Sequence, residues 1–401
     1  MNFLYSKNAI ALLIAYFSTT IAHGASFEQP ADDFDDDFDA EIISYDEQNG
    51  TPSFNNSSQE MDHKKFQDGC WPFENKGWTA SAAFLYWKID QSLLDFAFAK
   101  DFPVYQANSN PDSCPLDGLA GDEKRATFDW QPGFRLDLGY EFNASKWILN
   151  GEYTWYHSSH ANSAKTPKNK GEQTCNLGTF PFSFLVQTMA GFLNFTPDEA
   201  QSKIDFHYNV ANLTFQKRIT VGTHFNLIPY FGIQGAWIEE DWKVKYMSGF
   251  VSTFANELNV KYDWDFKGGG IIVGFASEYC LGMGFSFYGD ITFASMYGPY
   301  HASHTAKSKP ALHETFEKIS PSDHRTIQNT DIQAGVAWSK NFSHAALRIF
   351  AGWEFNTWYN LAEFYRFTEN SNPLAGFQKS RAVDKSDITM QGLTTGLSVK
   401  F

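Results

Sequence analysis

The residues best suited to chemistry in this chain are histidines, and none of them stands in a spacing typical of a catalytic site. His157 and His160 enclose two serines in the sequence HSSH, which could pair a general base with a nucleophile. No carboxylate pair or further partner stands near them in the sequence. Four other histidines are equally isolated: His207, His224, His301 and His304. We therefore expect no catalytic residues and no enzyme activity.

Metal and cofactor motifs are also missing from the sequence. It contains no HExxH, no CxxC and no paired Cys/His run. The acidic run at 34–39 lacks the glycine turn and the terminal glutamate of a calcium-binding loop. The glycines at 268–270, 282 and 284 open no helix and fit strand curvature better than phosphate binding. We expect no metal and no cofactor.

The elements that must position these residues are strands, because apolar residues recur with a period of two from Trp78 onward. In the segment 127–142 one face is apolar at all eight of its positions, and the other carries Arg135, Asp137 and Glu141. Between 204 and 215 the alternation changes phase, which suggests a β-bulge. Strands are predicted at 77–90, 126–142, 147–158, 203–218, 224–247, 260–279, 284–297, 326–341, 346–359 and 386–401.

The length of these strands favours a membrane barrel over a soluble sandwich, whose strands are usually shorter. Connections alternate between short (143–146, 219–223, 280–283, 342–345) and long, as periplasmic turns and outer loops do. The predicted fold is therefore all-β: a transmembrane antiparallel up-and-down β-barrel of about ten strands. Two connections exceed thirty residues, so twelve or more strands stay open.

Composition divides the chain into three parts. Residues 1–24 have the short apolar stretch and small residues at the cleavage site of a signal peptide. Residues 25–76 hold most of the net charge of −15 and are expected to be disordered. Residues 77–401 form the barrel, whose lipid-facing positions would hold many of the 39 Phe, 18 Tyr and 12 Trp. An acidic chain of this kind is not expected to bind nucleic acid.

The polar face of the predicted strands carries charges of both signs. In a barrel this face lines the lumen, where the charges would either stay hydrated in a pore or pair across the interior. Ten strands enclose only a narrow lumen. The candidate pore-lining residues are Arg135, Asp137, Glu141, Glu152, Asp290, Arg348, Glu354 and Lys400.

The second long connection contains a Phe-rich stretch at 179–195. Thr196, Pro197 and the acidic residues after them predict a short helix over 196–203. Two interpretations of 179–195 stay open: a segment that constricts the barrel mouth, or an ordinary surface loop.

The two chain ends carry further signals. Phe401 ends the sequence, with Val399 and Leu397 in phase behind it, a pattern favoured by the barrel assembly machinery of bacterial outer membranes. Four cysteines could form disulfides outside the cytoplasm. Cys114 and Cys175 fall in outer loops, whereas Cys70 and Cys280 fall at the periplasmic end. If a bridge forms within one chain, we expect Cys114–Cys175.

Several segments together resemble the pore-forming major outer-membrane proteins of Legionella and the chlamydia-like bacteria. They are AAFLYWKID (82–90), GFRLDLGYEF (133–142), WILNGEYTWYHSSH (147–160), LIPYFGIQGAWIEEDW (227–242), LGMGFSFYGDITFASMYG (281–298), AGWEFNTWYN (351–360) and DITMQGLTTGLSVKF (387–401). The resemblance implies a barrel in the outer-membrane lipid of a Gram-negative cell. It also implies a homo-oligomer or a disulfide-linked envelope network.

The favoured function is that of a porin, through which small hydrophilic solutes and ions diffuse passively. Two alternatives stay open: a surface adhesin or structural envelope barrel acting through its long outer loops, and a hydrolase at the barrel rim.

Overall fold

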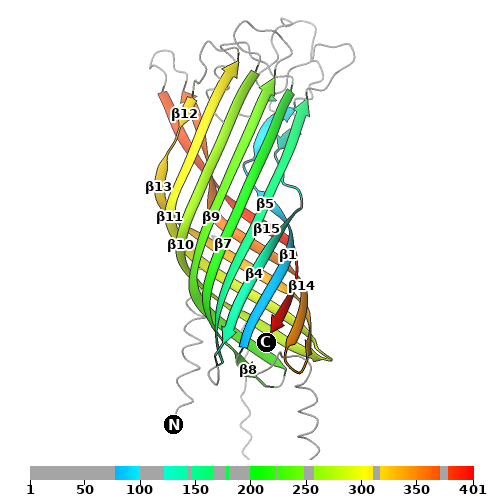
Figure 1. The fold of residues 1–401 in the computed structure, drawn as a ribbon. Helices are drawn as coiled ribbons and strands as arrows, with labels where there is room; N and C mark the ends of the chain where they lie inside the picture. The colour runs from blue at the N-terminus through cyan, green and yellow to red at the C-terminus, as the bar shows by residue number, and fades with distance from the viewer. Residues whose placement is uncertain are drawn as a thin grey trace, which may run out of the picture. The chain divides into compact units, whose positions relative to one another are not determined.

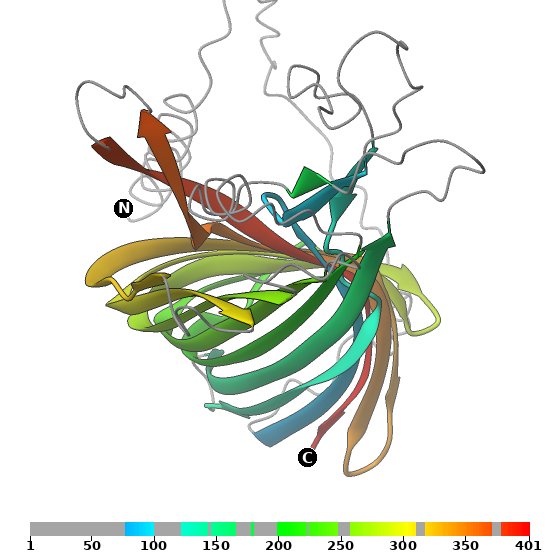
Figure 2. The ribbon, with the colours of Figure 1, turned by 90° about the horizontal axis from the view of Figure 1, so that it is seen from above.

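Ten long strands close into an antiparallel barrel in the computed structural model (Figures 1 and 2). The structure describes residues 77–99, 122–142, 146–165, 178–179, 199–222, 224–247, 257–309, 317–370 and 378–401. The wall strands are β1 (Gly77–Gln91), β4 (Gln131–Glu141), β5 (Trp147–Lys165), β7 (Glu199–Lys217), β9 (Phe225–Met247), β10 (Glu257–Gly282), β11 (Phe285–Lys309), β13 (Ser322–Asn341), β14 (Ala346–Asn370) and β15 (Gln378–Lys400). The short strands are β2 (Asp95–Ala99), β3 (Asp122–Arg125), β6 (Gly178–Thr179), β8 (Ile219–Val221) and β12 (Glu317–Ile319).

Closure of the wall is complete. Each wall strand pairs with its neighbours in the chain, and the last strand, β15, pairs with β1. At this seam Phe401 and Trp78 exchange backbone hydrogen bonds of 2.8 and 2.9 Å. A wall without a free edge is what lipid requires, since an unpaired backbone group in hydrocarbon is costly. The predicted ten-stranded antiparallel barrel is confirmed.

The strands are longer than predicted at the end that carries the long connections, which we call the loop end. β11 continues to Lys309 and β14 to Asn370, more than ten residues past their predicted ends. The helix predicted over 196–203 is wrong from Glu199 onward, because Glu199–Lys203 belongs to β7. Among the described residues, no helix is long and apolar enough to cross a membrane.

The opposite end, which we call the turn end, is built from tight connections. Between β10 and β11 the chain reverses at Gly282, Met283 and Gly284, all with positive φ. Glycine reaches this left-handed region without a steric penalty, so these two glycines serve the hairpin turn.

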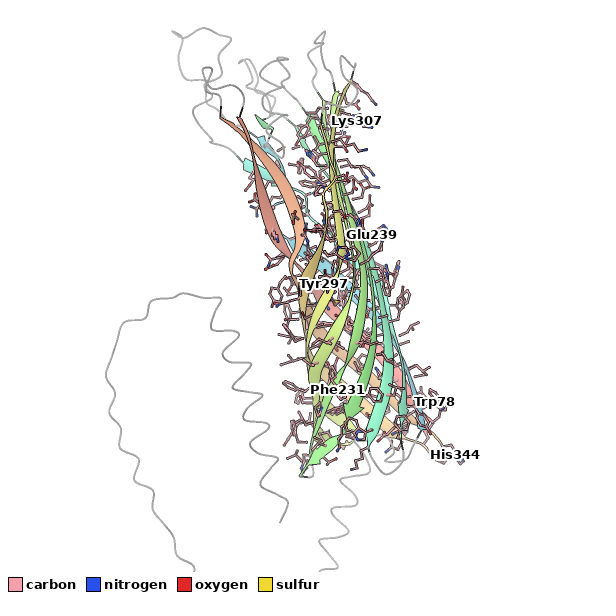
Figure 3. The ribbon with its side chains drawn as sticks, turned by 90° about the vertical axis from the view of Figure 1, so that its left-hand side faces the viewer. Trp78, Phe231, Glu239, Tyr297, Lys307 and His344 are labelled. Atoms are coloured by element: carbon pink, nitrogen blue, oxygen red, sulfur yellow. The ribbon has the colours of Figure 1, made fainter. Side chains whose placement is uncertain are left out.

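An apolar band encircles the outside of the barrel next to the turn end, and we call it the membrane belt. On β9 it comprises Phe231, Ile233 and Trp237, with exposed fractions of 56%, 61% and 47%. Exposed aromatic residues occur along it, for example Trp78 near the turn end, Phe231, and Tyr297 farther up (Figure 3). Exposed apolar bands flanked by aromatic residues are typical of barrels that span an outer membrane. Short connections are typical of the periplasmic end of such barrels, and long connections of the outer end.

Above the belt the polarity of the wall is inverted. On β9 the outward positions change from Trp237 to Glu239, Asp241 and Lys243, while the strand keeps its pairing with both neighbours. Figure 3 shows Glu239 and Lys307 beyond Tyr297 toward the loop end. We call this part of the barrel the outer half. Its outside is charged because it stands in water, so its apolar side chains must be buried inside.

The predicted bulge at 204–215 is wrong, and the inversion explains the change of phase. β7 pairs with β5 and β9 without a register shift along its length. Ile204, Phe206 and Tyr208 point inward in the outer half, whereas Leu213 and Phe215 point outward in the membrane belt. The apolar residues change sides because the surroundings of the strand change from water to lipid.

Apolar side chains fill the interior of the outer half, and we call this packing the outer core. Trp242 stacks on Tyr262 with ring centroids 5.4 Å apart and meets the edge of Phe364 at 5.8 Å. The first long connection contributes as well: Phe96 on β2 and Phe128 are both buried. β2 forms a small sheet with β3 and β6. Among the described residues, the first long connection therefore supplies side chains to the outer core, and 180–198 lies outside the described residues.

The carboxylate of Glu240 is buried in the outer core, and it should make stability depend on pH. Glu240 is 2% exposed and accepts hydrogen bonds from Trp264 Nε1 (3.1 Å) and Gln91 Nε2 (3.4 Å). Burial raises its pKa to about 7, more than these hydrogen bonds lower it. The folded state therefore holds this proton more tightly than the unfolded state does. Stability is expected to fall as the pH rises from about 4.5 to 7, and the full penalty applies above pH 7.

Glu240→Gln should remove this dependence. The variant should gain stability over the wild type above pH 7, by about 3 kcal/mol at most, at 1.36 kcal/mol per pKa unit. Unfolding by urea at pH 5 and pH 8 measures the difference. A wild-type barrel equally stable at the two pH values, with Glu240→Gln unchanged from it, would contradict this assignment.

Candidate functional site

The candidate site is the lumen inside the membrane belt, where the inner face of the wall is polar. The structure places all eight predicted pore-lining residues on this inner face: six line the two cavities, and Glu141 and Glu354 are buried beside Lys400 and Arg135. They lie there because strand positions alternate between faces, and lipid takes the apolar set.

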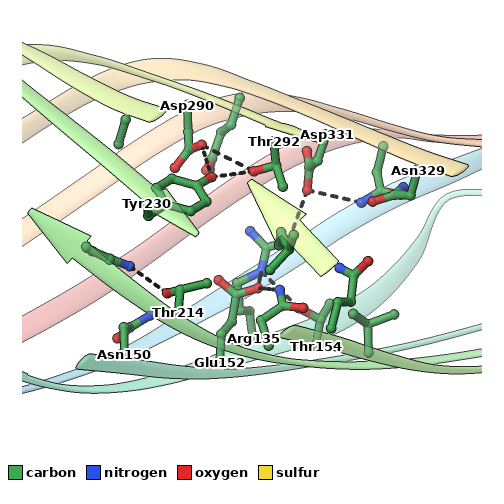
Figure 4. Close-up of a pocket in the computed structure, with 18 of the residues that line it drawn as sticks. Arg135, Asn150, Glu152, Thr154, Thr214, Tyr230, Asp290, Thr292, Asn329 and Asp331 are labelled. Carbon is green, nitrogen blue, oxygen red and sulfur yellow. Dashed lines mark hydrogen bonds and ion pairs between the residues drawn. The ribbon is translucent and has the colours of Figure 1, made fainter. Parts of the chain in front are cut away.

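An ion-pair network crosses the lumen at mid-belt. Arg135 donates to both carboxylate oxygens of Glu354, from Nη1 (3.1 Å) and Nη2 (2.5 Å). Its Nε lies 3.7 Å from Glu152 Oε1, and its Nη2 lies 4.0 Å from Asp331. Figure 4 shows Arg135 with Glu152 and Asp331. Such a two-pronged guanidinium–carboxylate contact is among the strong hydrogen-bonded pairs. The network joins β4 to β14 across the interior.

Neutral side chains hold the carboxylates of the network in place. Glu354, which is fully buried, also accepts from Thr394 Oγ1 at 2.8 Å. Glu152 accepts from Asn212 Nδ2 at 2.9 Å, and Asp331 accepts from Asn356 Nδ2 at 3.0 Å. A buried polar group without such partners would be costly, so these contacts are what allow one guanidinium and three carboxyl groups to share the lumen.

A small polar cavity of about 110 Å³ adjoins the network. On its far side Tyr230 OH donates to Asp290 Oδ1 at 2.6 Å and also contacts the hydroxyl of Thr292 (Figure 4). The cavity is large enough for several water molecules, and its lining offers them donors and acceptors. The lumen of the belt is therefore polar beside the ion pairs too.

A second cavity of about 310 Å³ lies nearer the turn end. Lys400 Nζ contacts Glu141 Oε2 at 2.5 Å, and Arg218 Nη1 lies 3.2 Å from the other oxygen of Glu141. Arg348 Nη2 lies 3.3 Å from Glu278 Oε1. Of the two alternatives left open by the sequence, charges hydrated in a pore or paired across the interior, the structure shows pairing.

Several lumen residues were missed by the sequence reasoning, chiefly Asp331, Glu278, Tyr230 and Arg218. Asp331 and Tyr230 occupy polar-face positions in alternating segments, so the period of two could have found them. Arg218 follows the end of β7, beyond the alternating segment, and its reach to Glu141 depends on the pairing of separate strands.

The two histidines of the HSSH sequence do not form a common site. Positions 157 and 160 fall on opposite faces of β5. His157 stacks on His207 with ring centroids 4.2 Å apart, and His160 Nδ1 lies 2.7 Å from Asp129 Oδ2. Among the described residues no group of His, Cys, Asp and Glu is placed to hold a metal ion.

The cysteine and chain-end predictions fall mostly outside the described residues. Cys70, Cys114 and Cys175 lie there, as do the predicted signal peptide and acidic segment. Cys280, near the end of β10, is disulfide-bonded, and its partner lies outside the described part of the chain. The predicted Cys114–Cys175 pairing stays a prediction. Outward positions at the seam are occupied by Leu397, Val399 and Phe401. Their role in assembly stays a prediction.

A scan against protein families matches residues 70–401 to the family described as Legionella pneumophila major outer membrane protein precursor. The search of curated proteins gives no match. Solved structures with similar chains include the outer membrane protease OmpT from Escherichia coli, at 9% identity over 84% of this chain and 100% of that one, with a TM-score of 0.37. A major outer membrane protein from Thermus thermophilus has 8% identity over 82% and 100%, with a TM-score of 0.27. A Pseudomonas aeruginosa FadL homologue has 11% identity over 81% and 90%, with a TM-score of 0.26.

Proposed function

The chain belongs to the Legionella major outer membrane protein family, and from that premise we propose that it is a narrow pore for ions and small hydrophilic solutes. Its place is the bacterial outer membrane. The family's printed description gives no transport activity, so the proposal rests on the lumen.

The observation that carries the proposal is the mainly polar inner face of the membrane belt between the turn end and mid-belt. A barrel held only by packing could fill this interior with apolar side chains, as the outer half does. Here the two cavities and the ion pairs follow one another from the turn end to mid-belt. Polar and charged side chains of this kind give a permeating ion partners that replace part of its water shell.

Charge supports a preference for cations. Among the described inner-face residues of the belt, carboxylates outnumber cationic groups seven to four. The carboxylates are Asp137, Glu141, Glu152, Glu278, Asp290, Asp331 and Glu354, and the cations are Arg135, Arg218, Arg348 and Lys400. A negative lumen raises the local concentration of cations.

Two barriers narrow the pathway. Arg135 and its carboxylates cross the lumen at mid-belt, and the outer core fills it above. Passage therefore requires these groups to move, which predicts a low conductance with opening and closing steps. A wide, permanently open pore does not fit ten strands.

Reconstitution of the full chain into a planar bilayer tests the proposal. We expect discrete conductance steps in KCl, together with liposome swelling only for the smallest of a graded series of sugars. Membranes that stay silent after insertion of folded barrel, verified by its heat-dependent mobility on gels, would refute the proposal.

A second candidate function is a surface or structural barrel without transport. The outer core favours it, because an aromatic-packed outer half makes a rigid support for outer loops. Silent bilayers combined with binding of the barrel to an envelope or external partner would select this function. We also propose that the chain is not an enzyme and that it forms homo-oligomers. Recognition of its last strand by the barrel assembly machinery is part of the same proposal.

A further inference from the structure

The outside of the outer half carries charges in separated rows, and this pattern points to a ligand. Lys243 on β9 lies directly opposite Lys203 on β7 and Lys261 on β10. We call these three residues the lysine row. Like charges opposite one another destabilise a sheet. The lysine row therefore concentrates positive charge at a place where it needs anionic partners.

A row of aspartates lies two residues closer to the membrane belt. Asp241 stands opposite Asp205 and Asp263, on the same three strands. Each lysine pairs with an aspartate of this row, at 3.1 Å for Lys203–Asp205 and 3.0 Å for Lys243–Asp241. Lys261 lies within 3.0 Å of both Asp241 and Asp263. These pairs hold the ammonium groups in place.

The lysine row lines a groove of about 750 Å³ on the outer face. The lining contains six lysines and a single carboxylate, that of Glu199. The six are Lys165, Lys203, Lys243, Lys245, Lys261 and Lys307. Their side chains remain accessible: those of Lys203, Lys243 and Lys261 are 58%, 55% and 41% exposed. An ammonium group has three N–H donors, so a lysine paired with one aspartate can still donate to an anion.

The height of the groove narrows the choice of anion. Lys243 is six residues beyond Trp237, the rim of the belt on the same strand. At about 3.3 Å per residue and a strand tilt near 40°, the lysine row stands about 15 Å above that rim. This is the level of a saccharide headgroup that extends from the outer leaflet.

A two-fold contact with a second copy of the chain does not fit this face. Two copies in one membrane have the same orientation, so a two-fold contact through this face would place lysine row against lysine row. We therefore propose that the groove binds the phosphate groups of the outer-leaflet glycolipid, lipopolysaccharide, as it surrounds the barrel. Basic pockets at a membrane surface hold lipid phosphates in this manner.

The test uses the full chain refolded in lipid-free detergent micelles and titrated with purified lipopolysaccharide. We expect Lys203→Gln/Lys243→Gln/Lys261→Gln to bind at least about tenfold more weakly than the wild type, since each lysine near an anionic surface contributes attraction. The matched control carries the same charge change at the turn end: Lys146→Gln/Lys217→Gln/Lys340→Gln should bind as the wild type does. The Arg version of the lysine row should also retain binding.

Three results would overturn the inference. They are a triple variant with wild-type affinity, equal binding of dephosphorylated lipopolysaccharide, and preferential binding of heparin, which would indicate a soluble polyanion as the ligand. If the triple variant does not fold, two other measurements decide the question. They are the affinity of the single variant Lys243→Gln for lipopolysaccharide and the affinity of the wild type for dephosphorylated lipopolysaccharide.

Discussion

Arg135→Met should destabilise the barrel by about 3–5 kcal/mol, because it leaves buried carboxylates without their cation. Glu354 is fully buried and loses both of its guanidinium hydrogen bonds. Glu152 and Asp331 lose the positive charge they share. Urea unfolding in detergent micelles, with folded and unfolded fractions separated on gels, measures this loss.

The same residue should control conductance. With Arg135 shortened, the mid-belt constriction loses its bridging group, and single-channel conductance should rise in variants that fold. Arg135→Lys is the matched control: it keeps the charge but loses the two-pronged contact with Glu354. We expect intermediate stability and conductance nearer the wild type. An Arg135→Met barrel as stable and as conductive as the wild type would show that the network does not bridge the lumen.

Trp242→Ala should cost about 3–5 kcal/mol, the usual range for removing a large buried aromatic side chain. Trp242 is fully buried, donates from Nε1 to Ser202 Oγ at 2.8 Å and stacks on Tyr262. No membrane lipid can fill the space left behind, because the outer half stands above the belt. The loss should appear as a lower urea midpoint.

Trp237→Ala is the control on the same strand. Trp237 is 47% exposed on the outside, at the rim of the membrane belt. Its removal deletes an interfacial anchor and leaves the core intact, so we expect less than half the loss found for Trp242→Ala. The reverse order of effects would mean that the polarity of the outer half is not inverted.

The alternation of residues predicted the barrel, its ten strands and the inward direction of the pore-lining candidates. It did not reveal the outer half, although the signal was present. In β9 the apolar residues simply move from Phe231 and Ile233 to Trp242 and Val244, one face to the other. A period of two shows which residues share a face. It cannot show where lipid ends, and that boundary decides which face is apolar.

The partners in the lumen could not be predicted for a different reason. Arg135 and Glu354 are 219 positions apart. Their meeting depends on the stagger of strands around the closed wall, because this stagger sets the height at which each inward residue stands. Small errors in strand boundaries would bring a different carboxylate to the guanidinium.

The most direct test of a conducting lumen is the reversal potential across a bilayer with unequal KCl concentrations. We predict cation preference for the wild type and a clear loss of that preference in Glu152→Gln/Asp290→Asn, which removes two lumen carboxyl groups. Glu239→Gln/Asp265→Asn removes two charges from the outside of the barrel and should leave the reversal potential unchanged. An anion preference, or equal shifts in both double variants, would contradict conduction through this lumen.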